Sequence, residues 1–191
     1  MSENDKKLIV ISGSSGVGKG TVIKSLLERN SDIKLSVSYT TRLPRTGEQE
    51  GVNYFYRTMK EFKKAVENDE FLEWAEFSGN CYGTKKSFVV KSLEKGEHVI
   101  LEIDTQGALQ IKEKMPEALL IFIAPPSYEE LVARLRGRRT ETEEAIQKRL
   151  DFVELEKENS KKYDYIIVND TVENAVAQIE KIINEGKSGQ G

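Results

Sequence analysis

The chain has 191 residues, of which 38% are hydrophobic and 32% are charged, and its formal net charge is −3 at pH 7. This length corresponds to about one domain, with a buried core and room for a smaller inserted lobe, and the composition is that of an ordinary globular protein. The slightly acidic balance excludes a global field that would attract nucleic acid or a membrane surface, so any anion must be bound by local basic residues.

Short apolar runs rich in β-branched residues recur along the chain without polar alternation, which is typical of strands buried on both faces. Helical patterns separate these runs. In chain order we expect a strand at 8–11, a helix at 21–27, a strand at 99–103, a helix at 105–114, a strand at 119–123, helices at 127–135 and 143–161, a strand at 165–168 and a helix at 172–184. This alternation predicts an α/β fold, with a parallel sheet flanked by helices.

The segment from about 34 to 96 breaks the alternation. It contains short aromatic and β-branched pieces at 35–39, 53–56 and 71–77, and a charged helical pattern at 60–68. We therefore expect a small mixed β lobe inserted into the α/β core. Residues 137–142 are polar and basic with no apolar anchor, so we expect a mobile flap there and a disordered tail at 186–191.

The segment GSSGVGKGT, residues 13–21, directly follows the first predicted strand. It matches the start of a phosphate-binding loop, in which backbone amides and a helix N-terminus hold the phosphates and the lysine reaches the β- and γ-phosphates. An accidental glycine-rich turn is the alternative, but a place between a buried strand and a helix favours a nucleotide site. The hydroxyl that normally ligates Mg²⁺ is missing, because position 20 is Gly and the first hydroxyl follows at Thr21.

Two carboxylates, Glu102 and Asp104, end the predicted strand in the run HVILEID. A period of two places them on one face at the carboxyl end of the strand, where open α/β sheets bind ligands. Acidic groups there need a cation or a donor partner, although an ordinary pair of surface carboxylates would look the same.

Arg42 and Arg45 flank Pro44, which stiffens the chain and presents both guanidinium groups beside tyrosines. Such a pair fits a bidentate phosphate site, but taken alone it fits a solvated basic turn as well. The same alternatives hold for four later arginines, Arg134, Arg138, Arg139 and Arg149.

Eight segments together resemble the guanylate kinase family: GKGT, SYTTRLPRTGE, GVNYF, EFLEWAEFSGNCYGT, LEIDTQG, FIAPPS, RLRGRRTETEEAIQKRL and IVND. They follow the family order from residue 9 to 170. The segment SYTTRLPRTGE together with YGT is highly specific to this family. The resemblance implies a P-loop NTPase core at about 1–33, 97–126 and 147–185, a GMP-binding insert at about 34–96 and a lid at about 127–146 that closes over ATP. It also implies Mg²⁺-dependent transfer of the γ-phosphoryl group of ATP to GMP, giving ADP and GDP.

The resemblance assigns roles to individual residues. It implies that Arg138 and Asn169 lie near the adenine of ATP. It implies that the ATP phosphates bind to the loop residues Gly13, Ser14, Ser15, Gly16, Val17, Gly18, Lys19, Gly20 and Thr21. The GMP phosphate would contact Arg42, Arg45, Tyr54 and Tyr82, and the base would contact Ser38, Glu73 and Thr84. Glu102 and Asp104 would lie close to GMP and the metal. Catalysis would rest on Lys19, Arg42, Arg134, Arg138 and Arg149.

The chemistry of guanine fits these roles. Glu73 can accept hydrogen bonds from N1–H and the 2-amino group, while Ser38 or Thr84 donates to O6. Adenine would leave the carboxylate unpaired, and such a mismatch costs a factor of roughly 10⁴ or more. The GMP phosphate is already anionic, so a direct in-line transfer needs no general base and no covalent intermediate, and Lys19 with the lid arginines neutralises the transferred group.

Three positions depart from the family pattern: Ser14 replaces a common proline, Arg139 a usual glycine and Glu102 a common aspartate. Because Gly20 lacks a hydroxyl, we expect the phosphates and water to hold Mg²⁺ with no direct protein ligand, Glu102 and Asp104 acting through that water. Thr21 is then expected to contact the α-phosphate of ATP.

Two other functions remain as alternatives. A scaffold module of the same fold binds phosphopeptides without catalysis. We expect such a module to lose loop glycines, Lys19 or the lid arginines, whereas this chain keeps all of them. A kinase for another nucleoside monophosphate would not need Glu73. We expect no nucleic-acid or membrane partner and a monomer or small homo-oligomer. The single cysteine, Cys81, and the lack of a secretory signal or of an apolar stretch of roughly 18 residues predict a cytoplasmic protein.

Overall fold

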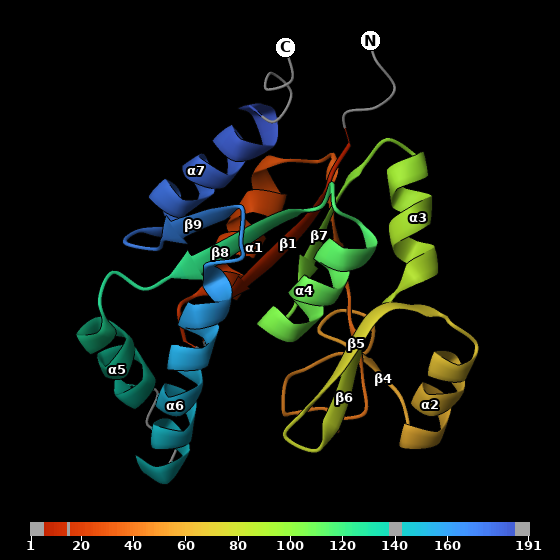
Figure 1. Ribbon diagram of the computed structural model, residues 1–191, viewed down its shortest axis with the longest axis horizontal. Coiled ribbons are helices and arrows are strands. Elements are labelled where there is room, and N and C mark those ends of the chain that lie inside the picture. The colour runs from red at the N-terminus through yellow and green to blue at the C-terminus, as the bar shows by residue number, and fades with distance from the viewer. Residues whose placement is uncertain (1–5, 15, 138–142, 186–191) are drawn as a thin grey trace. The chain divides into compact units, whose positions relative to one another are not determined.

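The computed structural model describes residues 6–14, 16–137 and 143–185 (Figure 1). Residues 138–142 of the expected flap and the expected disordered tail at 186–191 lie outside this described part. The chain divides into two compact units, Met1–Val10 with Asp32–Ala118 and Ile11–Ser31 with Leu119–Gly191.

A five-stranded sheet has the order β2-β7-β1-β8-β9. Its strands are β1 (Leu8–Gly13), β2 (Ile33–Ser36), β7 (His98–Glu102), β8 (Leu119–Ala124) and β9 (Tyr165–Val168). The pairs β2–β7 and β8–β9 are parallel, and every residue of β1 is buried, as expected for apolar runs without alternation. The predicted α/β fold, with a parallel sheet flanked by helices, is confirmed (Figure 1).

The first unit also holds a smaller sheet with the order β4-β3-β6-β5. Its strands are β3 (Tyr39–Thr40), β4 (Phe55–Tyr56), β5 (Phe71–Phe77) and β6 (Asn80–Lys85). Since β3 is parallel to β4 but antiparallel to β6, the sheet is mixed, as predicted. Helix α2 (Met59–Glu67) contributes Phe62 to a buried cluster with Phe71 and Cys81. A capping box between Thr58 and Glu61 starts this helix.

One expectation for this region is wrong, and one helix was not predicted. Residues 35–39 do not form one strand, because β2 ends at Ser36 in the large sheet and β3 begins at Tyr39 in the small one. The sequence patterns also miss α3 (Lys86–Glu94), which packs against β7. Its N-cap, Lys85, makes no side-chain capping bond, and only Val89 and Ser92 are buried, so the usual start signal and apolar stripe are both weak.

Helix α4 (Thr105–Lys114) packs against β5, which is an edge strand of the small sheet. The side-chain amide of Gln110 pairs with the backbone of Trp74, donating to its carbonyl at 2.9 Å and accepting from its N–H at 3.4 Å. Lys114 Nζ donates to the carbonyl of Leu72 at 2.6 Å. Side chains of α4 therefore bind the strand that carries Glu73.

In the second unit, α1 (Lys19–Arg29) packs against α7 (Val172–Glu185), as Figure 1 shows. Asn30 ends α1 and joins it to α7, since its amide donates to the Leu26 carbonyl at 2.9 Å and to Glu180 Oε1 at 2.8 Å. Helices α5 (Tyr128–Gly137) and α6 (Glu143–Ser160) contact each other through a cluster of Leu131, Leu150 and Val153. The predicted helices agree with these bounds to within two residues.

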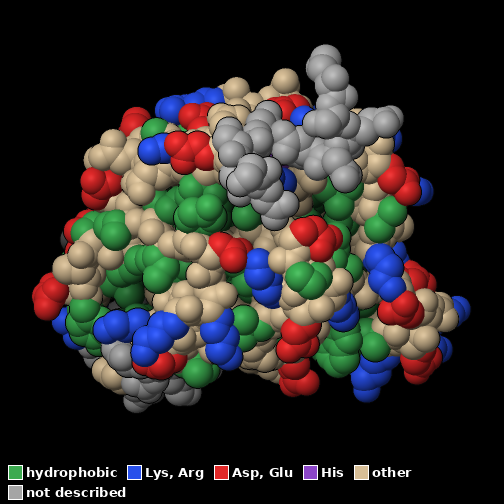
Figure 2. Space-filling view, turned by 45° about the horizontal axis from the view of Figure 1, so that its top comes forward, with side chains coloured by type: hydrophobic (Ala, Val, Ile, Leu, Met, Phe, Trp, Pro, Cys, Tyr) green, Lys and Arg blue, Asp and Glu red, His purple; other side chains and the backbone are tan. Residues whose placement is uncertain are grey.

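The surface carries both charge signs. Figure 2 shows basic and acidic side chains interspersed over one face, in keeping with the net charge of −3. No helix in the described part of the chain is long and apolar enough to cross a membrane.

Candidate functional site

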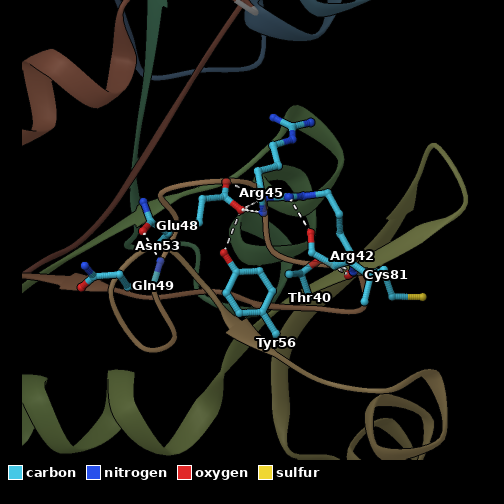
Figure 3. A network of polar contacts seen from close by, with 9 residues as sticks. Thr40, Arg42, Arg45, Glu48, Gln49, Asn53, Tyr56 and Cys81 are labelled. Carbon is cyan, nitrogen blue, oxygen red and sulfur yellow. Dashed lines mark hydrogen bonds and ion pairs between the residues drawn. The ribbon is translucent and has the colours of Figure 1, made fainter.

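The turn that carries the two arginines is organised around Glu48 (Figure 3). Arg42 Nη2 donates to both carboxylate oxygens of Glu48, at 2.8 and 3.0 Å, and Arg42 Nη1 donates to the Leu43 carbonyl at 2.8 Å. The Tyr56 hydroxyl donates to Glu48 Oε2 at 2.9 Å, and the backbone N–H of Arg45 donates to the same oxygen at 2.8 Å. These donors, Arg42 first, lower the pKa of Glu48 to about 2, so the carboxylate is ionised at neutral pH.

The Arg45 guanidinium differs from that of Arg42. It extends away from the Glu48 carboxylate (Figure 3), and its residue is exposed. The turn itself closes through the backbone N–H of Glu48, which donates to the Arg45 carbonyl at 3.0 Å, and Gly47 has a φ of +87°, a value that side-chain-bearing residues rarely adopt. The sequence RTGE therefore places the Arg45 side chain towards solvent and the Arg42 side chain against the lobe.

Two tyrosines of the predicted phosphate site lie beside Arg42. The rings of Tyr54 and Tyr82 are 6.0 Å apart at an angle of 65°, and Arg42 Cζ lies 5.3 Å from the centre of the Tyr54 ring. Burial raises the pKa of the Tyr54 hydroxyl, and the neighbouring Tyr82 and Glu102 raise it further. Arg42, Tyr54, Tyr82 and Glu102 therefore gather in one place, although they come from four separate stretches of the chain.

The predicted base-reading carboxylate is buried inside the same unit. Glu73 on β5 pairs with Thr84 on β6, and the Thr84 hydroxyl donates to Glu73 Oε1 at 2.6 Å. The Glu73 residue is only 3% exposed, and burial is the main cause that raises the pKa of its carboxyl to about 7. The negative charge of Asp104 raises this pKa too, whereas Lys114 opposes the shift.

The first turn of α4 reaches the other Glu73 oxygen. A Cβ added to Gly107 would lie 2.5 Å from Glu73 Oε2, so only a glycine leaves the carboxylate its present place. Asp104 is the N-cap of α4, and its Oδ1 accepts a hydrogen bond from Gly107 N–H at 2.8 Å. Glu73, Thr84 and Asp104 are thus brought together. Ser38 lies between β2 and β3, and its carbonyl accepts a hydrogen bond from Phe55 N–H at 2.9 Å.

The expectation that Glu102 and Asp104 share one face of a strand is wrong. Strand β7 ends at Glu102, and Ile103 separates it from the helix cap at Asp104. The reason is local, because an aspartate ahead of a helix gains more from capping the free N–H groups than from extending a strand. Glu102 is exposed, whereas an oxygen of Asp104 is already bonded to its own helix.

In the second unit, the glycine-rich loop joins β1 to α1. Gly13 must be a glycine, because a Cβ there would lie 2.3 Å from the carbonyl oxygen of Ile123. Gly16 and Gly18 have φ values of +87° and +94°, and α1 begins directly afterwards at Lys19 with no side-chain cap on its first turn. Lys19 Nζ donates to the Gly13 carbonyl at 2.6 Å, which turns the ammonium back over the loop. This geometry suits an anion at the helix N-terminus.

Asn169 fixes the shape of this loop. Its residue is 5% exposed, and its Nδ2 donates to the Val17 carbonyl at 2.7 Å. A Cβ on Gly18 would lie 2.9 Å from the same nitrogen. The structure therefore gives Asn169 a contact with the loop backbone, and its role near adenine stays a prediction.

The remaining predicted residues belong to the glycine-rich loop and to the segment from α5 to α6. Gly20 and Thr21 are exposed, and a Cβ on Gly20 would meet nothing within 4 Å. Ser15 and Arg138 lie outside the described residues, and so do the side chains of Arg134 in α5 and Arg149 in α6. Among the described residues, no group of three or more His, Cys, Asp or Glu side chains could hold a metal ion.

Sequence reasoning gave no role to Glu48, Tyr56 or Gly107. The spacing of Glu48, three residues after Arg45 across a glycine turn, is the signal that could have identified it. Gly107 carries no such signal, because its importance depends on β5 approaching α4.

Comparison with known proteins gives one consistent family. The family model described as guanylate kinase matches residues 5–186. The chain is 54% identical to the guanylate kinase of Caldanaerobacter subterraneus, over 92% of this chain and 85% of that protein. It is 53% identical to the guanylate kinase of Prochlorococcus marinus, over 95% of this chain and 98% of that one. The crystal structure of guanylate kinase from Anaplasma phagocytophilum is similar over 97% of this chain and 88% of that chain, with 34% identity and a TM-score of 0.81.

Proposed function

The chain belongs to the guanylate kinase family of nucleoside monophosphate kinases, and on this premise we propose that it transfers the γ-phosphoryl group of ATP to GMP, giving ADP and GDP. The buried pair of Glu73 and Thr84 carries the choice of acceptor. An ionised Glu73 accepts two hydrogen bonds from N1–H and the 2-amino group of guanine, and the Thr84 hydroxyl can turn to donate to O6. Adenine has an acceptor at N1, so it would leave a desolvated carboxylate without a partner.

The GMP phosphate would bind where Arg42, Tyr54 and Tyr82 gather, with the exposed Arg45 folding onto it. Guanidinium and phenol groups are donors that a phosphate dianion accepts well. Ser38 is assigned to the base alongside Thr84.

The ATP phosphates would bind to the loop from Gly13 to Thr21. Positive-φ glycines turn amide N–H groups towards an anion, and the uncapped first turn of α1 adds its dipole. Lys19 would exchange its bond with the Gly13 carbonyl for the β- and γ-phosphates.

For the transfer itself, an oxygen of the GMP phosphate attacks the γ-phosphorus in line, and ADP leaves. The nucleophile is already ionised, so no general base and no covalent intermediate are needed. We assign Lys19, Arg42, Arg134, Arg138 and Arg149 to stabilise charge on the transferred group, and a lid at about 127–146 to bring in Arg134 and Arg138 beside Arg149. The substrate and product are guanine nucleotides, which places the reaction in purine nucleotide metabolism.

Mg²⁺ would supply charge neutralisation on the β- and γ-phosphates when it is bound. The donors fit an ion held mainly by phosphate and water. Glu102 is exposed at the end of β7 and can accept from metal-bound water, whereas Asp104 caps α4 and has less freedom to do so. Position 20 offers no hydroxyl.

A coupled assay of ADP release, with GMP, AMP, UMP and dTMP as acceptors, tests the proposal. We expect turnover with GMP and roughly 10⁴-fold lower kcat/KM with AMP. Equal rates with AMP, or none with GMP, would overturn the assignment.

A further inference from the structure

The carboxylate of Glu48 stands out because it is placed by three donors from three residues. Arg42, Tyr56 and the backbone of Arg45 all donate to it, at distances between 2.8 and 3.0 Å (Figure 3). The Glu48 and Arg42 side chains are only 19% and 15% exposed. An ion pair shielded in this way keeps one geometry, unlike most surface pairs.

A second pair on the same stretch of chain provides a comparison. Glu50 accepts from Arg57 Nη1 at 2.8 Å and from Tyr56 N–H at 2.8 Å, so it too combines an arginine with a backbone donor. Its side chain is 52% exposed, however, and that of Arg57 is 32% exposed. The Arg57 guanidinium lies over the rings of Tyr39 and Phe55, neither of which is assigned to the phosphate site.

The bonds to Glu48 and Leu43 determine which donors of Arg42 a ligand can use. A guanidinium group has five N–H donors. Nη2 points at Glu48 and Nη1 contacts the Leu43 carbonyl, which within the described part of the chain leaves Nε and the second Nη1 hydrogen. The group is also held 5.3 Å from the centre of the Tyr54 ring. Arg42 therefore presents a fixed set of donors beside Tyr54 before any anion arrives.

We propose that Glu48 is a positioning residue for acceptor binding, which holds the Arg42 guanidinium in the orientation that receives the phosphate of GMP. The inference rests on the proposed function, because it names the residue that prepares that phosphate site. Glu48 does not touch the substrate. It lowers the conformational entropy that Arg42 loses on binding, and it does so at the expense of part of the positive charge.

Two variants of Glu48 and one matched control separate this role from a general effect on folding. Glu48→Ala removes every acceptor, whereas Glu48→Gln keeps one oxygen for Arg42 and loses the second. Glu50→Gln removes the same charge from the comparison pair. Binding of GMP and of guanosine is measured by calorimetry, and KM and kcat are measured for GMP and ATP.

We expect Glu48→Ala to weaken GMP binding on the order of tenfold or more, with guanosine binding and the KM for ATP changed less than about twofold. Glu48→Gln should fall between Glu48→Ala and the unmodified chain, and Glu50→Gln should match the unmodified chain. If Glu48→Ala does not fold, Glu48→Gln alone carries the comparison.

Unchanged GMP affinity in both Glu48 variants would overturn the inference. So would an equal loss of GMP and guanosine, because a purely structural role weakens both ligands. If the unmodified chain itself neither binds nor phosphorylates GMP, the proposed function fails first, and this outcome is distinct from the other two.

Discussion

Replacing Glu73 by Gln should change how stability depends on pH. The Glu73 carboxyl is 3% exposed, and burial raises its pKa from 4.5 to about 7 in the folded chain. Between these two values the folded chain retains a proton that the unfolded chain has released. The free energy of unfolding therefore falls as pH rises from about 4.5 to about 7, and this contribution is constant above pH 7.

The size of the effect follows from the same two values. The pKa difference between 4.5 and about 7, at about 1.4 kcal/mol per pH unit, amounts to roughly 3 to 4 kcal/mol. Glu73→Gln has no proton to release and keeps an oxygen that can accept from Thr84. At pH 8 the variant should be more stable than the unmodified chain by up to this amount, and near pH 4.5 the two should be alike.

Urea denaturation without nucleotide, at four pH values from 5 to 8, measures the difference between the two proteins. Taking the difference removes the contribution of titrating groups that do not interact with Glu73, which leaves its own proton and its coupling to Asp104 and Lys114. Glu76→Gln is the control, because it removes a carboxylate from the same strand at an exposed position. A difference that stays constant across this range, or grows towards low pH, would refute the reasoning. Saturating GMP should reverse the order, because only the carboxylate of Glu73 accepts both guanine donors.

Three further predictions concern the two nucleotide sites. Lys19→Ala should lower kcat at least about 10²-fold while far-UV circular dichroism stays unchanged, and near-normal turnover would contradict its role on the phosphates. Gly107→Ala should raise the KM for GMP at least about tenfold, because the new Cβ would lie 2.5 Å from Glu73 Oε2. The melting temperature should not fall in proportion, because alanine favours a helix over glycine by about 1 kcal/mol. Gly20→Ala, whose Cβ would meet no atom within 4 Å, is the matched control, and an unchanged KM for Gly107→Ala would contradict the contact. Gly20→Ser fits the open space at that position and should lower the Mg²⁺ concentration needed for half-maximal turnover, whereas an unchanged requirement would show that the hydroxyl has no part in metal binding here.

Much of the fold follows from local patterns. Strands β1, β7, β8 and β9 of the large sheet are short apolar runs, which the sequence pattern predicts, whereas β2 (IKLS) is not such a run. The glycine loop has the spacing expected between a buried strand and a helix. The division of residues 35–39 between two sheets could not be predicted, because both pieces are short and equally suited to strand. Their separation depends on pairing partners distant in the sequence, His98–Leu101 for one and Tyr82–Gly83 for the other.

In the candidate site, too, some features follow from the sequence and others depend on contacts between distant parts of the chain. Glu73 and Thr84 are suggested by motif, and the structure shows what a motif cannot, namely that the carboxylate is buried and touches the first turn of α4. A period of two predicts Asp104 on the strand with Glu102, but the capping of α4 determines its conformation. The sequence gives no role to Glu48, because its three donors, Arg42, Tyr56 and the Arg45 backbone, meet it only in the folded turn.

Gln110 has a consequence beyond the nucleotide site. An edge strand presents unpaired N–H and C=O groups on which another chain can add a strand and start aggregation. On β5, the amide of Gln110 occupies the N–H and C=O of Trp74, and Lys114 occupies the carbonyl of Leu72. Side chains of α4 thus occupy backbone groups of Leu72 and Trp74, on either side of Glu73, to which a strand of another chain could otherwise bond.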